Sequence, residues 1–480
     1  MLGERSHGNP DGEPRALPAR GARPTRPRSA ASLSKALRQL GHNVTVALPR
    51  QPGFEDSGLF LARRLTPLRL PDGGEVPLID AQLPSGVQVT LFDAPVLFDR
   101  PGAYGETEDY PDNAARFALL SQAAASLVRQ RAEQGTQFDI VHLHDAPTAL
   151  VPLLLSRMPG PSVPTVLTIH DATRQGSFEL DAAEGLPRDL WTDPSLVVEG
   201  EVNLLRAGLA HAQVVTTVSP GYSSELARGF GAFSKALEAS GKQVIGITNG
   251  VDYSVVNPAT DAALASRYDA ENPSGKAICK GAVLRELELS VELERPLILI
   301  EGPLTPERGG ELLLASLPLL LKRDAFVVVA SELSAPQAKK LRLLRSRRRD
   351  DFGLVERPTA ATARRAYAAA DIALFAPRHC PCGQSQLVAE RYGAIPVARA
   401  VGGMCDTIVD ADAALETGTG FLFDEESEAA LDAAVGRALA ALSSASAGRF
   451  RRRIMRLDSS WDRPARRYLQ VYRSALGAGR

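Results

Sequence analysis

The sequence predicts an α/β protein that contains two doubly wound, Rossmann-like domains. Two features indicate this fold class. Short apolar segments alternate with helical stretches and end in polar residues, as parallel strands buried on both faces do. The alternation lapses over residues 251–290, which are turn-rich and weakly periodic, and it restarts beyond them. We therefore expect one sheet before this connector and another after it.

The first predicted domain spans residues 31–250. Its first element is a helix over residues 29–42, where Leu33, Leu37 and Leu40 recur at helical spacing. The other expected elements are a long helix over residues 113–132 and strands over residues 43–49, 88–95, 138–145, 164–171, 212–219 and 244–250.

The second predicted domain spans residues 291–455, and an amphipathic helix is expected in the closing segment 456–480. Residues 1–30 are rich in arginine, proline and glycine and are expected to be a disordered tail outside both domains. Strands of the second domain are expected over residues 296–302, 326–331, 371–377 and 395–400. In parallel sheets ligands bind beyond the carboxyl ends of the strands, so the functional candidates are the residues that follow each strand.

The composition excludes several classes of protein. The 480 residues contain 55 Lys and Arg against 56 Asp and Glu, a net charge of −1 that does not suit a nucleic-acid binder. No apolar run approaches the roughly 20 residues of a membrane-spanning helix, and no secretory signal is recognised. Only four cysteines occur, which favours a reducing compartment and a cytoplasmic protein.

Ten collinear motifs resemble the bacterial glycogen synthases and plant starch synthases. They occupy residues 98–105, 109–117, 139–145, 168–178, 206–222, 246–261, 267–280, 381–403, 418–423 and 460–473. The resemblance implies a GT-B glycosyltransferase, in which two Rossmann-like domains face each other across a cleft. It also implies transfer of glucose from ADP-glucose to the non-reducing end of an α-1,4-glucan, with retention and without a metal or cofactor. Adenine as the donor base follows from the resemblance to the bacterial enzymes.

The resemblance assigns a role to each matched residue. His170 would lie near the transferred glucose, although a structural histidine bonded to a carbonyl is the alternative. Arg308 stands where the family has a lysine and would carry the charge that faces the donor phosphates. The remaining donor-binding candidates are Asn249, Gly302, Gly383, Gln384, Gly402 and Gly403, and the glucan-binding candidates are Asp112, Asn113, His144 and Asp145.

Some of these residues have simpler interpretations. Without their motif context, Asn249-Gly250 would indicate only a turn, and Gly402-Gly403 would be a weak signal. His142 with His144 could form a metal pair, but the absence of a nearby carboxylate cluster favours a site without metal.

The sequence departs from the family at three donor-site positions. A Lys-Thr-Gly-Gly-Leu loop should fall on residues 22–26, where neither the glycines nor a preceding strand occurs. Pro303 replaces an arginine that is expected on the donor phosphate, and Cys380 replaces a glutamate that normally contacts the sugar. The arginine-rich tail is compatible with a misassigned start codon and with a real replacement of the loop. Cys380 and Cys382 could be a redox or metal pair, but a structural thiol is favoured.

Three functions therefore remain open. The first is a glycogen synthase-like enzyme with impaired activity. The second is an inactive paralogue that binds glucan or regulates its synthesis. The third is a transferase with another donor specificity. The basic run over residues 342–351 could also bind a polyanion, although a solvated helix end is the commoner case.

Overall fold

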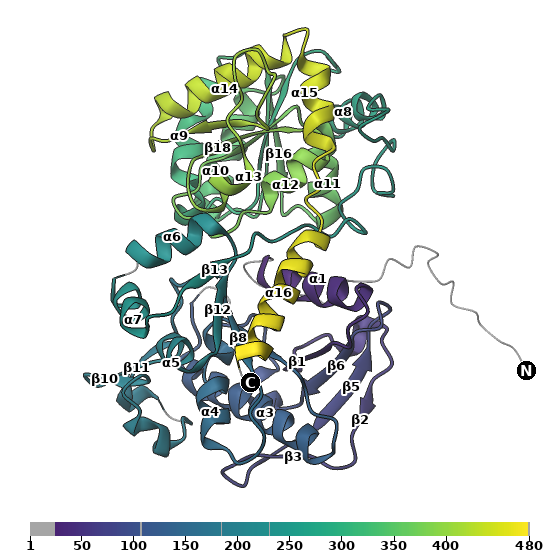
Figure 1. The fold of residues 1–480 in the computed structure, drawn as a ribbon. Coiled ribbons are helices and arrows are strands. Elements are labelled where there is room, and N and C mark those ends of the chain that lie inside the picture. The colour runs from purple at the N-terminus through teal and green to yellow at the C-terminus, as the bar shows by residue number, and fades with distance from the viewer. Residues whose placement is uncertain (1–24, 106–107, 184, 230, 479–480) are drawn as a thin grey trace, which may run out of the picture. The chain divides into compact units, whose positions relative to one another are not determined.

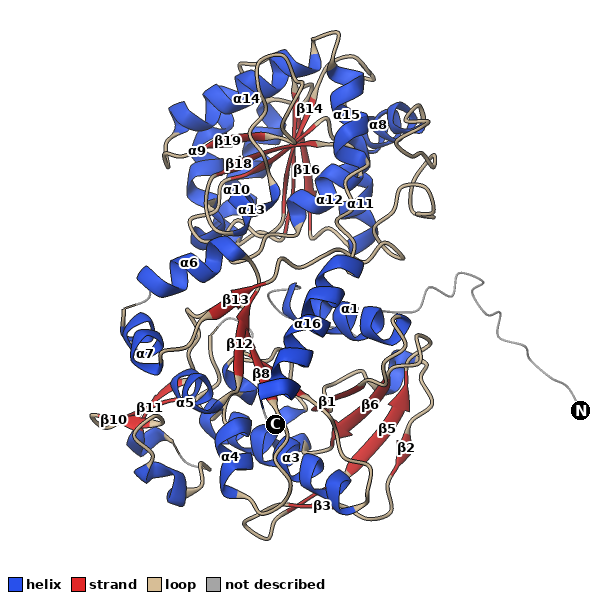
Figure 2. Cartoon of the chain, viewed as in Figure 1, coloured by secondary structure: helices blue, strands red, loops and turns tan. Residues whose placement is uncertain are grey.

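The computed structural model describes residues 25–105, 108–183, 185–229 and 231–478. The chain divides into two compact units (Figures 1 and 2). Unit 1 comprises residues 1–168, 172–215 and 472–480, and unit 2 comprises residues 169–171 and 216–471. Residues 216–250 thus group with unit 2, although the sequence placed them in the first domain.

Unit 1 contains a four-stranded, a three-stranded and a two-stranded sheet, most of a second four-stranded sheet, and several helices. The longest described helix of unit 1, α3, lasts 21 residues, most of which are buried. The helices are α1 (Thr25–Gln39), α2 (Pro95–Phe98), α3 (Asn113–Glu133), α4 (Val151–Arg157) and α5 (Leu204–His211). The strands are β1 (Thr45–Pro49), β2 (Ala62–Arg63), β3 (Leu68–Arg69), β4 (Glu75–Val76), β5 (Leu78–Gln82), β6 (Gln88–Phe92), β7 (Val141–His144), β8 (Thr165–Ile169), β9 (Ser177–Glu179), β10 (Val197–Val198), β11 (Glu201–Asn203) and β12 (Val214–Thr217).

The first sheet of unit 1 is mixed rather than parallel. Its order is β1-β6-β5-β2, and β1 pairs with β6 in parallel as expected. However, β5 runs antiparallel to β6, and β2 runs antiparallel to β5. The expectation of a wholly parallel sheet is therefore wrong here. The reason is a tight hairpin, in which Leu83 N–H donates to the Val87 carbonyl and Gly86 adopts a φ of +82°.

The second four-stranded sheet has the order β13-β12-β8-β7, in which β13 (Val244–Gly246) groups with unit 2. Within the described residues, β7 pairs only with β8, and β1 pairs only with β6, so each presents an open edge. All five residues of the inner strand β8 are buried, whereas three of the four residues in β7 are only half-buried.

No strand precedes α1 within the described residues. This helix begins at Thr25, earlier than the expected residue 29. Residues 22–24 of the expected phosphate loop lie outside the described residues, and residues 25–26 belong to the helix.

Unit 2 contains one six-stranded sheet with helices on both faces (Figure 2). Its helices are α6 (Pro220–Arg228), α7 (Ala232–Ser240), α8 (Gly275–Glu286), α9 (Gly310–Leu320), α10 (Ala335–Arg347), α11 (Ala360–Ala369), α12 (Ser385–Arg391), α13 (Gly403–Thr407), α14 (Glu428–Leu442), α15 (Ala447–Met455) and α16 (Asp462–Ala478), whose last residues group with unit 1. Its strands are β13 (Val244–Gly246), β14 (Leu297–Glu301), β15 (Phe326–Ser331), β16 (Phe352–Glu356), β17 (Ile372–Phe375), β18 (Ile395–Arg399) and β19 (Phe421–Phe423).

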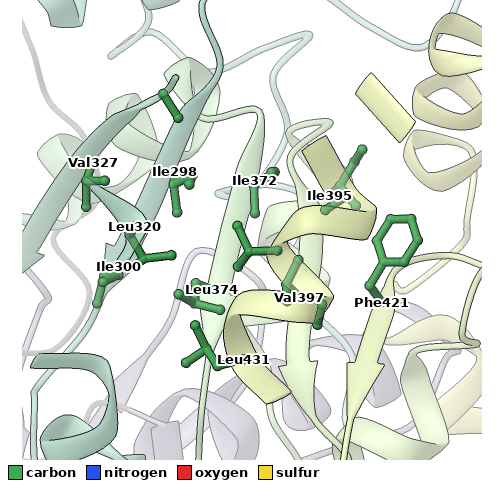
Figure 3. Packing of buried hydrophobic residues seen from close by; sticks show 14 of the residues in the cluster. Ile298, Ile300, Leu320, Val327, Ile372, Leu374, Ile395, Val397, Phe421 and Leu431 are labelled. Atoms are coloured by element: carbon green, nitrogen blue, oxygen red, sulfur yellow. The ribbon is translucent and has the colours of Figure 1, made fainter. Parts of the chain in front are cut away.

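The sheet of unit 2 has the order β16-β15-β14-β17-β18-β19, and all its strand pairs are parallel. Alternate residues of β14 enter different cores. Ile298 and Ile300 pack with α9 and α14 on one face, and Leu297 and Leu299 pack on the other (Figure 3). Because both faces are covered, the strands are almost continuously apolar. The direction of chain progression reverses between β14 and β17, and this switch point is where such sheets bind ligands.

Two predicted segments contain more structure than the sequence indicated. The connector expected over residues 251–290 includes helix α8, whose Lys276 ammonium donates to the carbonyls of Tyr367, Ala368 and Tyr392. The basic run over residues 342–351 forms the end of α10 and is partly neutralised by Arg342–Glu356 and Arg348–Asp351 ion pairs. Among the helices described, none is both long and apolar enough to cross a membrane.

Candidate active site

Two loops meet at the switch point of the unit 2 sheet. The segment after β14 contains the 3₁₀ turn Pro306–Arg308, and the segment after β17 leads into α12. The Glu307 carbonyl accepts from the backbone N–H of Arg378 at 2.9 Å and from that of His379 at 3.3 Å. A Cβ atom at Gly309 would lie 1.7 Å from the Ala376 carbonyl oxygen, so only glycine allows this approach. The two loops are therefore fixed against each other.

Arg308 lies against Gly302, the residue that follows β14. Gly302 has a φ of +96°, and a Cβ atom there would stand 2.8 Å from Arg308 Nη1. The guanidinium is half-buried and lies close enough to Cys380 to favour its thiolate electrostatically. Pro303, also half-buried, follows Gly302 directly and offers no side-chain donor where the family resemblance expects a second guanidinium. The loop therefore keeps one of two expected cations.

Cys380 and Cys382 are free thiols, each 9% exposed. Burial raises the pKa of each to about 12, so both stay protonated at neutral pH. Asn249 hydrogen-bonds to Cys382 and opposes this rise in its pKa. No metal-binding group of three or more His, Cys, Asp or Glu side chains occurs in the described parts of the chain. The arrangement suits structural thiols better than a redox or metal pair.

The loop that starts α12 is tied to the segment after β13. Gln384 Nε2 donates to the Gly250 carbonyl at 2.7 Å. A Cβ atom at Gly250 would lie 2.4 Å from the Ser460 carbonyl oxygen, so this glycine permits a close backbone approach. Gly383 adopts a φ of +64° and lies over the Gln386 side chain. These contacts bring Asn249-Gly250 and Gly383-Gln384 together in unit 2.

Gly402 and Gly403 pack under the same loop. Cβ atoms at these positions would lie 2.1 Å from the Cys380 carbonyl oxygen and 2.0 Å from that of Cys382. The Gly402 N–H donates to Glu225 Oε1 at 2.9 Å, and the Gly403 N–H donates to the Cys380 carbonyl at 2.8 Å. Both amides expected to face phosphate are thus occupied within the protein in this conformation. The glycines serve here to let two loops touch.

His170 and Asp171 follow β8 and group with unit 2, with exposed fractions of 8% and 9%. Asp171 Oδ1 lies 3.8 Å from His379 Nε2, and Glu225 Oε2 lies 4.0 Å from His379 Nδ1. The Tyr222 ring packs edge-on against the imidazole, with 5.2 Å between ring centres. His379 thus links the residue next to His170 with helix α6. No motif assigned a role to His379, Glu225 or Asp171. The available signals were the position of Asp171 beside His170 in the motif over residues 168–178 and that of His379 beside the replaced Cys380.

The predicted glucan residues Asp112 and Asn113 lie at the start of α3 in unit 1. Asp112 forms an ion pair with Arg100. Asn113 is 2% exposed, with Nδ2 donating to the Tyr104 carbonyl at 2.7 Å and Oδ1 accepting from Arg116 at 2.6 Å. Asn113 therefore supports the loop over residues 98–105 by hydrogen bonding to its backbone. Asp112, with a side chain 37% exposed, keeps surface to offer a ligand.

His144 and Asp145 lie at the carboxyl end of β7. The His144 ring packs on His142 with 4.4 Å between ring centres, and His142 Nε2 lies 2.6 Å from Thr168 Oγ1. Asp145 is 5% exposed and has a φ of +57°, a strained backbone for a residue with a side chain. Strain of this kind persists where surrounding contacts hold it and is common at binding sites.

Comparison with solved structures defines the class of the protein as a GT-B glycosyltransferase. A sucrose-phosphate synthase from Thermosynechococcus elongatus shares the fold with a TM-score of 0.58 at 17% identity, covering 94% of this chain and 93% of that chain. The catalytic domain of starch synthase IV from Arabidopsis thaliana, bound to ADP and acarbose, matches with a TM-score of 0.83 at 27% identity, covering 94% and 95%.

The chain belongs to the glycogen and starch synthase family. A glycogen synthase of an Anaeromyxobacter species is 38% identical over 470 residues, which covers 93% of this chain and 94% of the relative. The glycogen synthase of Thioalkalivibrio sulfidiphilus is 36% identical over 462 residues, with 93% and 95% covered. The family profile described as the starch synthase catalytic domain matches residues 28–241.

Proposed function

We propose that the protein transfers a glucosyl group from ADP-glucose to the non-reducing end of an α-1,4-glucan, with retention and at a reduced rate. The observation that carries this proposal is the seating of Arg308 against Gly302 at the switch point of the unit 2 sheet. A nucleotide-diphosphate donor is the ligand that a cation at such a switch point suits. The starch synthase IV catalytic domain, which is similar in fold, was crystallised with ADP.

The chemistry requires stabilisation of charge on the leaving diphosphate. Arg308 would supply it, since a preorganised cation lowers the barrier more than a mobile one. His170 would hold the transferred glucose by a hydroxyl so that its anomeric carbon stays in line. Gly383 and Gln384 would position the donor from the neighbouring loop. In unit 1, Asp112, His144 and Asp145 are the residues we assign to the glucan.

The reduced rate is proposed from two replaced side chains. Pro303 removes a guanidinium, and the Cys380 thiol, protonated because burial raises its pKa to about 12, is a poor acceptor for a sugar hydroxyl. Removing one preorganised electrostatic group typically costs about 10²–10³ in rate. The two losses need not multiply, because groups that act together are not additive.

Extension of maltoheptaose tests the proposal. The purified protein is incubated with ADP-glucose or UDP-glucose, and products are resolved by mass spectrometry. We expect slow addition of single glucose units from ADP-glucose, and the variant His170→Asn should abolish it. His211→Gln is the matched control, because His211 lies at ion-pair distance from Asp193 in unit 1. Extension from UDP-glucose alone would reject adenine as the donor base, and extension by His170→Asn at the full rate would reject the assigned site.

A catalytically silent glucan-binding protein is the second candidate. It is favoured by the contrast between the two units. The Arg100–Asp112 and Arg116–Asn113 contacts that support the 98–105 loop are in place, whereas donor-site side chains are replaced. Co-sedimentation with glycogen tests it. Retention of the protein without any glucose transfer would favour this candidate, and loss of retention would exclude it.

A further inference from the structure

Four charged side chains of alternating sign form a connected network in unit 2. Arg378 Nη2 donates to Glu311 Oε2 at 2.8 Å, and Arg378 Nε donates to Glu426 Oε1. Arg399 Nη1 lies 3.3 Å from Glu426 Oε2, the second oxygen of the same carboxylate. Because these charged groups share partners, each contact restricts the position of the next one.

The four residues come from four neighbouring strands of the unit 2 sheet. Their positions are the segment after β14 for Glu311, the segment after β17 for Arg378, the end of β18 for Arg399 and the segment after β19 for Glu426. These strands are adjacent in the order β14-β17-β18-β19, and all their pairs are parallel, so their carboxyl ends lie at one edge of the sheet. The switch point between β14 and β17 lies at this edge, and the network connects its two sides.

Arg378 holds the turn that contains Arg308 at two points. The Arg378 backbone N–H donates to the carbonyl of Glu307, the residue before Arg308, at 2.9 Å. The Arg378 side chain bonds to Glu311, which lies three residues after Arg308 in the first turn of α9. One residue therefore contacts the chain on both sides of Arg308.

The side-chain contacts of Arg378 should matter more for the position of Arg308 than for stability. The Arg378 side chain is 42% exposed, and exposed ion pairs contribute little to the free energy of unfolding. A guanidinium binds phosphate through directed hydrogen bonds, which depend closely on its position. A displacement of about 1 Å in such a group can cost about 10²-fold in rate.

We propose that Arg378 is a positioning residue for donor binding, which holds the Arg308 guanidinium where a nucleoside diphosphate meets it. This inference rests on the proposed function, because it assumes that the donor diphosphate binds at Arg308. Arg378 acts through the turn between Glu307 and Glu311 and does not itself contact the donor.

Binding of ADP to the full-length protein, measured by isothermal titration calorimetry, tests the proposal. Arg308→Ala should raise the Kd for ADP by about tenfold or more, and Arg378→Met should raise it by about fivefold. Methionine keeps the backbone bond to Glu307, so this substitution removes only the side-chain contacts. The double variant should bind ADP within about twofold of Arg308→Ala, because a residue that acts through Arg308 has no further effect once that guanidinium is absent.

Arg437→Met is the matched control. Arg437 Nη1 donates to Asp410 Oδ2 at 2.8 Å, and the Arg437 side chain is 44% exposed and also belongs to unit 2. Both substitutions remove an exposed ion pair, so both should lower the Tm slightly, whereas only Arg378→Met should weaken ADP binding. Glu311→Gln, which breaks the same contact from α9, serves if Arg378→Met does not fold.

Each outcome decides the question. A raised Kd in Arg378→Met that adds nothing in the Arg308→Ala background supports the positioning role, because a general loss of stability would weaken both backgrounds. An unchanged Kd in Arg378→Met, a change equal to that in Arg437→Met, or a full additional loss in the double variant overturns the inference and leaves the proposed function intact. Absence of ADP binding by the wild type, or an unchanged Kd in Arg308→Ala, overturns both.

Discussion

Gly302 and Arg308 are in direct contact, and the space above Gly302 is filled by the Arg308 guanidinium. A Cβ atom at position 302 would lie 2.8 Å from Arg308 Nη1, and the backbone there has a φ of +96°. The absence of a side chain at position 302 thus leaves room for the only guanidinium that we assign to the donor phosphates. A methyl group added at position 302 should therefore change the position of the Arg308 side chain.

Gly302→Ala should displace the Arg308 side chain and strain the backbone by about 1–3 kcal/mol. We expect glucose transfer to fall by about tenfold or more, approaching the loss in Arg308→Ala. Steady-state kinetics with ADP-glucose measure the effect. Gly41→Ala is the matched control, because Gly41 has a φ of +91° and no neighbouring atom within 4 Å of its added Cβ. An equal loss of activity in both variants would refute the contact as the cause.

Restoring an arginine at position 303 should raise the rate of transfer. Pro303→Arg supplies a second cation for the leaving diphosphate, and we expect about a tenfold gain or more. Cys380→Glu alone should gain less, because the new carboxylate would enter a buried position close to Glu225. The double variant should exceed either single one. If Pro303→Arg gives no gain, the missing guanidinium is not the main defect.

Glu390 in α12 should make stability depend on pH. The side chain is 1% exposed, neither of its carboxyl oxygens has a hydrogen-bond partner in the described part of the chain, and burial raises its pKa well above the usual range. Above the ordinary pKa of 4.5 the unfolded chain loses this proton while the folded chain keeps it. The free energy of unfolding therefore falls as pH rises from that value toward the folded pKa.

Glu390→Gln removes this proton linkage. The variant should be more stable than the wild type at neutral pH, and its advantage should grow with pH by at most about 1.4 kcal/mol per unit. Urea unfolding between pH 5 and pH 8 measures it. Glu332→Gln, at an exposed position, should show no such trend. A difference that stays constant with pH would contradict the buried, protonated state of Glu390.

One of the four thiols should react readily with Ellman's reagent in the folded protein. Cys405 is exposed, whereas Cys279, Cys380 and Cys382 are buried. Burial raises the pKa of all four, so even Cys405 should react more slowly than a free thiol. All four should react after denaturation. A Cys380–Cys382 disulfide, or three fast thiols, would instead favour a redox pair.

The sequence predicted most strands of unit 2 because they are apolar and separated by helices. The strands β14, β15, β17 and β18 occur where they were expected. No strand was predicted at β16, because charged residues flank its short apolar segment, or at β19, which has only three residues. The sequence also missed the antiparallel β5, because the identity of a strand's partner depends on the hairpin turn rather than on the apolar pattern.

The sequence indicated the segments of the candidate site but not the contacts between them. Motifs at strand ends located Arg308, Gly302 and the Gly383-Gln384 loop at one edge of the unit 2 sheet. Local sequence could not show that Asn113 is buried under its own loop or that Glu225 occupies the Gly402 N–H. Both facts depend on contacts between residues that are separated along the chain. His379, Asp171 and Glu225 likewise come together from three segments that are far apart along the chain.

We propose that this chain is a glycogen synthase-like glucosyltransferase whose donor site is weakened. Incorporation of labelled glucose from ADP-glucose into glycogen by the purified protein is the decisive measurement. We expect incorporation that requires ADP-glucose, proceeds below about 1 s⁻¹ and rises in Pro303→Arg. Turnover in the usual range of about 1–10³ s⁻¹ would contradict the weakened donor site, and no incorporation by either protein would contradict the enzyme itself.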